Sequence, residues 1–377
     1  MANCLDYISW RGDLSCELSK VNEVDRMLFS VVGKPDYTGI IPASGEAISL
    51  ENAVEQYLDE HANQTKIGLL GSPLLISVLR KMADSERYRN IRLTSFVNKV
   101  LTEEEEQFSA LTVSAPDGVS YISFRGTDDS LVGWKENCEL AVQNSVPAQR
   151  DALAYLRRAS ELCEGPLVVC GHSKGGNLAV YAACCAEAEI QDRILAVYSY
   201  DGPGFQESFM TSDGYLRMES RIITYVPQRS IVGMLLNTAG KQSVVFSGEG
   251  GVAAHDVLNW SVDRNGLIPG EELSALSSSF HLAINETLDG MAIDERQELV
   301  EEIFDLLYST GASMLSDFSE GTLRKTLEMA KHFRKASELH AFLLRLSEIT
   351  LKSAVTHQRR ELFTDAVEIS DADISQL

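Results

Sequence analysis

The feature that most constrains this chain is a serine set among glycines, between a predicted strand and a predicted helix. Residues 167–170 are wholly apolar, which is typical of a strand buried on both faces of a sheet. Residues 175–187 then have the composition and period of a helix. The segment between them is Gly171-His172-Ser173-Lys174-Gly175-Gly176. Side chains at 171 and 175 would collide with neighbouring backbone, so this composition predicts a sharp turn with the serine hydroxyl clear of the sheet.

Ser173 is therefore the candidate nucleophile of the chain. It is expected at a helix N-terminus, where free N–H groups and the helix dipole favour developing negative charge. The turn fixes the N–H of Lys174 beside it. Such a string also occurs in turns without chemistry, but here the required strand precedes it and the required helix follows.

The elements around this turn predict an α/β fold. Residues 108–114 and 119–124 alternate apolar and polar side chains on either side of a Pro-Asp-Gly turn, which indicates a β-hairpin. A helix is predicted over residues 147–163, and further strands over 195–200, 221–226 and 243–246. Strands that alternate with helices predict a mostly parallel central sheet covered on both sides.

Both ends of the chain are predicted to be mainly helical. Helices are expected over 74–81 and 96–106, and later over 299–307, 323–333 and 339–354, with Asp294 and Gln297 as an N-cap pair. The acidic tail 365–377 is expected to fray. We divide the chain into a helical N-terminal region (1–107, a hypothetical cap or lid), a core (108–268) and a C-terminal helical extension (269–377).

Charge and cysteine usage narrow the function classes. The chain has 33 Lys plus Arg against 55 Asp plus Glu, a net charge of -22, which disfavours binding to nucleic acid and to anionic lipid headgroups. Its start lacks the basic and apolar runs of a signal peptide, and its apolar stretches are too short to span a bilayer. Seven irregularly spaced cysteines indicate reduced thiols in a cytoplasmic protein. Neither a metal nor a cofactor is expected, because no Cys/His group has ligand spacing.

Two motifs carry a family resemblance. The serine turn resembles that of class-3 (fungal-type) lipases, which is usually G-H-S-L-G-G. Phe124-Arg125-Gly126-Thr127 followed by Trp134 is similar to the F-R-G-[ST]…W segment of the same lipases. The lipase resemblance covers residues 108–255, and most of the chain resembles a bacterial lipase-like subgroup through segments 6–13, 201–204 and 226–228. The resemblance implies an α/β-hydrolase fold, and it assigns Thr127 as the second oxyanion-hole donor beside Lys174.

The catalytic base is expected after the serine, because the chain order in this fold is serine, acid, histidine. His255 fits, since it follows the strand 243–246 and a glycine-rich loop at 248–251. His172 is expected to point away from the site and to be structural. The other later histidines lie in apolar helical patterns that favour a surface or core role: His281, His332, His340 and His357.

The acid is open between two explanations. Class-3 lipases carry it in a segment like D-I-V-P, whereas this chain has Ser230 at the expected position, followed by Ile-Val-Gly. We choose Asp201, at the end of the strand 195–200. The alternative is that no acid exists and that Ser230 or a backbone carbonyl orients the histidine. Asp256 ranks lower, because neighbours in sequence rarely face each other.

Lys174 also departs from the family, which usually has leucine there. Its stem is expected to pack while the ammonium stays in solvent. The alternative is that the ammonium attracts an anionic acyl substrate.

The sequence thus predicts a serine hydrolase that cleaves a carboxylic ester of a small acyl or lipid-like substrate through an acyl-enzyme on Ser173. Thioesterase, amidase or acyltransferase chemistry would use the same residues. The serine at position 230 leaves a further alternative, a catalytically inactive lipase-like binding protein. No integral membrane association is expected, and the oligomeric state is left open.

Overall fold

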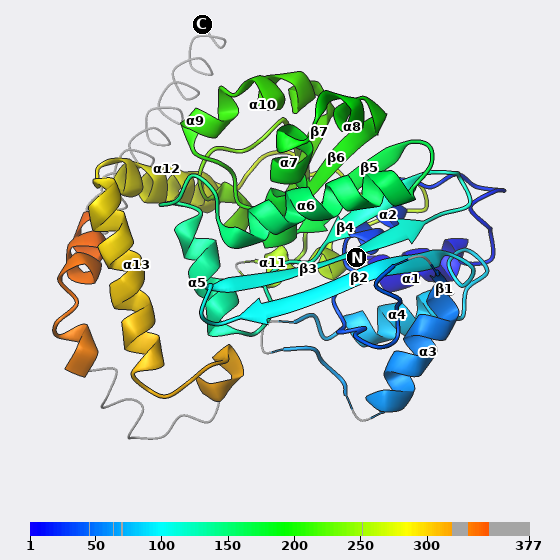
Figure 1. Cartoon of the computed structure of the whole chain (residues 1–377), viewed down its shortest axis with the longest axis horizontal. Coiled ribbons are helices and arrows are strands. Elements are labelled where there is room, and N and C mark those ends of the chain that lie inside the picture. Colours follow the sequence, from blue (N-terminus) through cyan, green and yellow to red (C-terminus); the bar gives the residue numbers. More distant parts are fainter. Residues whose placement is uncertain (45, 63, 69–70, 251, 319–330, 347–377) are drawn as a thin grey trace, which may run out of the picture.

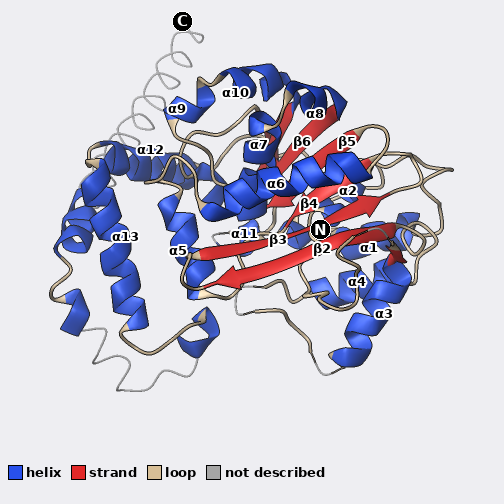
Figure 2. Cartoon of the chain, viewed as in Figure 1, coloured by secondary structure: helices blue, strands red, loops and turns tan. Residues whose placement is uncertain are grey.

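A computed structural model describes residues 1–44, 46–62, 64–68, 71–250, 252–318 and 331–346. Within these residues, eight strands lie side by side in chain order in one sheet. Figure 2 shows its central strands, β2 to β6, in red. Strands β1 to β4 are antiparallel neighbours, whereas β4 to β8 run parallel. The strands are β1 (Ile48–Ser49), β2 (Arg92–Leu101), β3 (Glu106–Ser114), β4 (Ser120–Phe124), β5 (Leu167–His172), β6 (Ile194–Tyr200), β7 (Ile222–Pro227) and β8 (Lys241–Val245).

Helices cover both faces of this sheet (Figure 1). One face carries α6 (Pro147–Leu162), α7 (Lys174–Cys185), α8 (Ala188–Arg193) and α10 (Asp213–Met218). The other carries α1 (Cys4–Arg11), α2 (Glu23–Phe29), α3 (Leu50–Glu60) and α4 (Leu75–Ala83). Side chains of β5 alternate between the two layers, since Val168 packs in the second layer and Val169 in the first. The predicted α/β-hydrolase fold is confirmed.

The predicted strands of the core are confirmed to within two residues at each end, as are the helices at 74–81, 147–163 and 175–187. The remaining elements are α5 (Leu131–Glu139), α9 (Glu207–Met210), η1 (Glu219–Arg221), η2 (Val232–Met234), α11 (Val252–His255), η3 (Val257–Asn259), α12 (Ala275–Asp289), α13 (Ile293–Tyr308) and η4 (Leu315–Phe318).

The helix predicted over 96–106 is wrong, because this segment forms most of β2 and the turn into β3. The segment contains helix formers, chiefly the glutamates at 103–106, but Phe96, Val97 and Val100 suit a strand, and β3 offers an antiparallel partner. Neighbouring side chains then face opposite layers: Phe96 packs against Tyr37, while Val97 packs with the α6 layer. Tertiary pairing overrides local propensity here.

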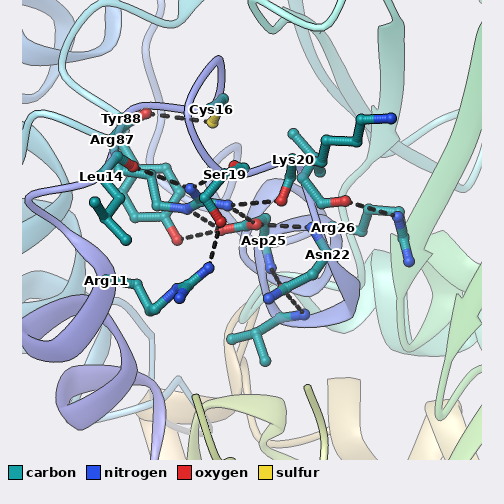
Figure 3. A network of polar contacts seen from close by, with 12 residues as sticks. Arg11, Leu14, Cys16, Ser19, Lys20, Asn22, Asp25, Arg26, Arg87 and Tyr88 are labelled. Carbon is teal, nitrogen blue, oxygen red and sulfur yellow. Dashed lines mark hydrogen bonds and ion pairs between the residues drawn. The ribbon is translucent and has the colours of Figure 1, made fainter. Parts of the chain in front are cut away.

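The N-terminal helices form a fixed layer of the core, joined by a buried ion pair between Asp25 of α2 and Arg87. Figure 3 shows Arg87 and Tyr88 both directed at the Asp25 carboxylate. The Tyr7 hydroxyl donates to the same carboxylate, and the Arg87 guanidinium also donates to the carbonyl oxygen of Leu14. Removing one member of such a pair costs about 3–5 kcal/mol, because the other charge stays buried. The division at residue 108 stays a prediction, although β1 and β2 extend the sheet from before it.

The C-terminal extension returns to the core after α13. The predicted N-cap pair is wrong: Ala292 is the N-cap of α13, and Glu295 accepts a hydrogen bond from its N–H. Segments 323–333 and 339–354 are described only from 331 to 333 and from 339 to 346, where the chain is helical, and the tail 365–377 lies outside the described residues. The boundary at residue 269 stays a prediction.

No helix in the described ranges is long and apolar enough to cross a bilayer. All seven cysteines fall in these ranges and are free thiols. Burial raises the pKa of the Cys170 thiol to about 12, so it stays protonated at neutral pH.

Candidate active site

The candidate nucleophile lies at the turn between β5 and α7. Ser173 has φ +59° and ψ -132°, a strained conformation that costs about 1–3 kcal/mol outside glycine. The glycines on either side make this bend possible. A Cβ at Gly171 would lie 2.1 Å from the carbonyl oxygen of Gly175, and one at Gly175 would lie 2.1 Å from that of Phe124. The local sequence therefore dictates the turn and leaves Ser173 half-buried at the carboxyl edge of the sheet.

Two backbone N–H groups are free beside the serine. Lys174 is the first residue of α7, so its N–H has no partner within the helix. Thr127 follows β4, and among the described residues neither its N–H nor that of Lys174 donates to another protein group. The loop passes close to the turn, since a Cβ at Gly126 would lie 3.1 Å from Ser173 Cβ. Asn137 of α5 holds the Thr127 side chain, with 2.5 Å from Nδ2 to Oγ1.

The candidate histidine and the candidate acid are in contact. His255 Nδ1 lies 2.7 Å from Asp201 Oδ2, and Asp201 is fully buried. Asp201 follows β6 in a left-handed conformation with φ +48°. His255 ends α11 with about a fifth of its side chain exposed. These residues follow parallel strands and meet at the same edge as Ser173, as their order in the chain predicts.

Ser230 contacts the acid and not the histidine. Its hydroxyl donates to Asp201 Oδ1, which also accepts the N–H of Gly233 at 3.2 Å. The second carboxylate oxygen is thereby left for His255. A Cβ at Gly233 would lie 2.3 Å from Oδ1, so glycine is required there. Of the two explanations left open by the sequence, the geometry favours Asp201 with Ser230 as its support. Asp256 instead caps η3 by accepting the N–H of Leu258.

His172 does not simply turn away from the site. Its Nε2 lies 2.8 Å from the carbonyl oxygen of His255, and the two rings are 4.6 Å apart. A carbonyl only accepts, so Nε2 carries the proton, and the buried Nδ1 has no hydrogen-bond partner within the described part of the chain. Burial moves the pKa of His172 well below 6.5, with Lys34 and His255 adding to that shift. The residue is thus a neutral support for the His255 backbone.

The expectation that the Lys174 ammonium stays in solvent is wrong. The side chain has no exposure, and Nζ pairs with Glu136 of α5, which is equally buried. Nζ also donates to the carbonyl oxygen of Gln107 at 2.7 Å. Burial lowers the pKa of Lys174, and the neighbouring Glu136 carboxylate opposes that shift. An ammonium committed in this way is not free to attract an anionic substrate.

Sequence reasoning missed Glu136 and Asn137, which lie on a helix that had not been predicted. A lysine directly after the nucleophile is a signal that a carboxylate lies nearby, because a buried ammonium needs a partner. The sequence contains many acids, however, and only the packing of α5 identifies Glu136.

Two further segments lie against the loop that carries Thr127. The N–H of Leu315 donates to the carbonyl oxygen of Asp129, and the N–H of Leu131 donates to that of Ser313. The C-terminal extension thus forms a short antiparallel bridge with this loop. From the N-terminal region, a Cβ at Gly68 would lie 3.3 Å from Asp129 Cβ. The lid hypothesis for residues 1–107 stays a prediction.

The later histidines follow His255 in the chain, and a large cavity opens at another edge of the sheet. His281 is bound to the carbonyl oxygen of Met234, while His357 lies outside the described residues. His332 and His340 lie on the described part of the C-terminal extension. A cavity of about 610 Å³ opens at the amino ends of β4 to β6, beside Arg26 and Tyr198, and so at the opposite edge of the sheet. In the described ranges, no cluster of three His, Cys, Asp or Glu side chains could hold a metal ion.

Comparison with solved structures found similarity to lipases. The lipase–propeptide complex of Rhizomucor miehei is 15% identical, with 42% of this chain and 57% of that chain covered and a TM-score of 0.32. The chain therefore spans less than two thirds of that lipase. Lipase II from Rhizopus niveus is 14% identical, with coverages of 51% and 75% and a TM-score of 0.32. M37 lipase is 11% identical, with coverages of 56% and 68% and a TM-score of 0.35. A search of curated proteins found no match.

A family model matches more than half of the chain. The model of the Mbeg1-like family matches residues 82–305, a stretch that includes Thr127, Ser173, Asp201 and His255. The family-level resemblance to lipases, stated from the motifs, is thereby confirmed. This chain belongs to the Mbeg1-like family.

Proposed function

We propose that this protein is a serine hydrolase that cleaves carboxylic esters through an acyl-enzyme on Ser173. One observation carries the proposal: the 2.7 Å contact between His255 Nδ1 and the buried Asp201 carboxylate, at the sheet edge where Ser173 lies. A carboxylate in this position selects the tautomer with the proton on Nδ1 and leaves Nε2 as the base. This contact favours an enzyme over an inactive binding protein, which had been left open because position 230 lacks a carboxylate.

The reaction follows from these positions. Ser173 Oγ attacks the ester carbonyl carbon while His255 Nε2 accepts the hydroxyl proton, which gives a tetrahedral intermediate. Its oxyanion is bound by the N–H groups of Lys174 and Thr127. The intermediate collapses when His255 returns the proton to the leaving alcohol. Water then attacks the acyl carbon while His255 Nε2 accepts a water proton, which gives a second tetrahedral intermediate. Its collapse breaks the bond to Ser173 Oγ, which takes the proton back from His255, and the carboxylic acid is released.

The substrate is proposed to be a small acyl or lipid-like ester. Thioester and amide cleavage and acyl transfer share the acyl-enzyme, so a panel with one acyl chain and different leaving groups separates them. Hydrolysis of p-nitrophenyl butyrate above that of the matched thioester and anilide supports the ester assignment. A higher kcat/KM for the thioester would reassign the enzyme.

The nucleophile is tested by replacement and by covalent labelling. Ser173→Ala should lower kcat by at least about 1,000-fold, because the nucleophile and its base act as a unit. A fluorophosphonate probe should label the parent at Ser173 and leave Ser173→Ala unlabelled. Ser208→Ala, which alters an exposed serine on α9, is the control and should match the parent in both assays. Full esterase activity in purified Ser173→Ala would refute the assignment.

A further inference from the structure

The residue after the candidate nucleophile has an unusual side-chain environment. Lys174 begins α7, and its ammonium pairs with the Glu136 carboxylate of α5. Neither side chain has any solvent exposure. The mechanism proposed above uses only the peptide N–H of Lys174 and gives the ammonium no part.

The pair joins four elements around the serine turn. Lys174 Nζ donates to the carbonyl oxygen of Gln107 in β3 at 2.7 Å. Glu136 accepts the N–H of Gln107 at 3.0 Å and the N–H of Ala148, in the first turn of α6, at 2.7 Å. The carboxylate therefore has a donor on each oxygen in addition to the ammonium. The network is nearly complete, as a buried charge pair requires.

Stability alone is a weak reason for such a pair. Taking two charges out of water costs several kcal/mol per ion, and apolar side chains of similar size often stabilise a core as well or better. What the pair adds is a restriction on where the Lys174 side chain can lie. Contacts between apolar side chains have little directional preference. Lys174 Nζ, in contrast, has to lie within hydrogen-bond distance of both the Glu136 carboxylate and the Gln107 carbonyl oxygen.

We propose that the buried Lys174–Glu136 pair is a positioning device that holds the peptide N–H of Lys174 where the oxyanion forms. The inference rests on the proposed function. The side chain ties Lys174 to α5 and β3, and this tether opposes a shift of its Cα and N–H away from the Ser173 turn. Glu136 and the Lys174 side chain are positioning groups and do not touch the substrate.

A second contact of α5 supports this role. Asn137, the residue after Glu136, donates to Thr127 Oγ1 at 2.5 Å. One turn of α5 thus contacts both residues whose N–H groups are proposed to bind the oxyanion. The helix fixes the spacing between these donors, and a displacement of about 1 Å in such a site costs roughly 100-fold in rate.

The test uses a double variant, since removing one partner alone would leave a buried unpaired charge. Lys174→Met with Glu136→Gln keeps the side-chain volumes and removes both charges. We expect kcat for p-nitrophenyl butyrate to fall about 10- to 100-fold with KM within about twofold, and fluorophosphonate labelling to slow in parallel. The glutamine amide introduced at position 136 has only one acceptor oxygen, so one of the two backbone N–H groups loses its acceptor, and the urea midpoint should fall. The kcat values are therefore compared where both proteins are fully folded.

The matched control is the pair formed by the neighbouring lysine of α5 with an acid of α13. Lys135 is nearly buried, and its Nζ contacts two partly exposed acids, Glu105 at 2.7 Å and Glu301 at 2.9 Å. Lys135→Met with Glu301→Gln should leave kcat within about twofold of the parent, because neither residue contacts an oxyanion donor.

The possible outcomes separate the two proposals. If the parent neither hydrolyses the ester nor reacts with the probe, the proposed function and this inference both fail. If the parent is active and the folded Lys174→Met/Glu136→Gln variant keeps the parent kcat, only the inference fails. Should that variant not fold, Glu136→Asp keeps both charges and withdraws the carboxylate by one methylene. A several-fold lower kcat in Glu136→Asp supports the positioning role, and an unchanged kcat overturns it.

Discussion

At the scale of single residues, Asp201 has both carboxylate oxygens engaged in contacts. One oxygen accepts from the Ser230 hydroxyl and the Gly233 N–H, and the other faces His255. The sequence left Asp201 and Ser230 as alternatives, because a serine replaces the expected acid after β7. The structure makes them partners. Their contact depends on how the ends of β6 and β7 lie together, which no local pattern states.

Ser230→Ala should therefore weaken catalysis without removing it. A hydrogen bond to a charged group contributes about 1.5–3 kcal/mol. We expect kcat to fall about 10-fold with KM unchanged, since the variant loses orientation of the Asp201 carboxylate rather than substrate contacts. Ser261→Ala, at a buried serine whose hydroxyl has only a long contact to a methionine sulfur among the described residues, is the control. Equal kcat in the two variants would show that Ser230 has no role.

His172 makes a prediction about pH. Burial moves its pKa well below 6.5, so below that pH the unfolded chain takes up a proton that the folded chain does not. The resulting stability is fully present above about pH 6.5 and is lost as the pH falls toward the folded pKa. His172→Gln keeps an N–H donor and cannot titrate. Its free energy of unfolding, from urea titrations at about pH 7.5 and 5.5, should fall less than that of the parent, and an equal fall would contradict the assignment.

At the scale of elements, the sequence predicted the helices and strands that local patterns determine. It missed the strand that depends on pairing with a neighbour. Strands β5 to β8 and the helices α6 and α7 follow from apolar runs and helical period. β2 did not, because the glutamates at 103–106 favour a helix although Phe96, Val97 and Val100 before them suit a strand. The same limit applies to the site. Ser173, with the peptide N–H of Lys174, follows from one turn, whereas Glu136 and Asn137 depend on where α5 packs.

The contact between the C-terminal extension and the Thr127 loop gives an element-scale prediction. Leu315→Pro removes the N–H that donates to the Asp129 carbonyl, and so frees one side of the loop. We expect a several-fold lower kcat toward p-nitrophenyl butyrate, because the Thr127 donor is held less firmly. Leu315→Ala keeps the N–H and is the matched control, with both variants compared at equal fraction folded. A Leu315→Pro variant as active as Leu315→Ala would mean that the extension does not support the loop.

At the scale of the whole molecule, the net charge is -22, and two carboxyl groups near the turn between β2 and β3 have a raised pKa. Burial raises the pKa of Glu106 to about 7, with Asp151 as the next cause. Burial likewise raises the pKa of Glu139 to about 7, with Glu105 next. Lys99 pairs with Asp151 and Lys135 pairs with Glu105. Two lysines do not balance the charge of the four carboxyl groups. The network that holds Lys174 thus lies beside carboxyl groups that change charge near neutral pH.

These two carboxyl groups predict a loss of stability with rising pH. Between the ordinary value of 4.5 and about 7, the folded chain holds protons that the unfolded chain has released. Their contribution is therefore fully present below about pH 4.5 and is lost as the pH rises through about 7, opposite in sign to that of His172. Glu106→Gln with Glu139→Gln should flatten the fall in free energy of unfolding between about pH 5.5 and 8, measured by urea titration. Glu103→Gln with Glu104→Gln removes two exposed charges from the same turn and should leave the slope near that of the parent. Only a group whose proton affinity differs between the folded and unfolded chains changes the slope of the free energy of unfolding against pH. Equal slopes in all three proteins would therefore show that Glu106 and Glu139 are not the groups that titrate.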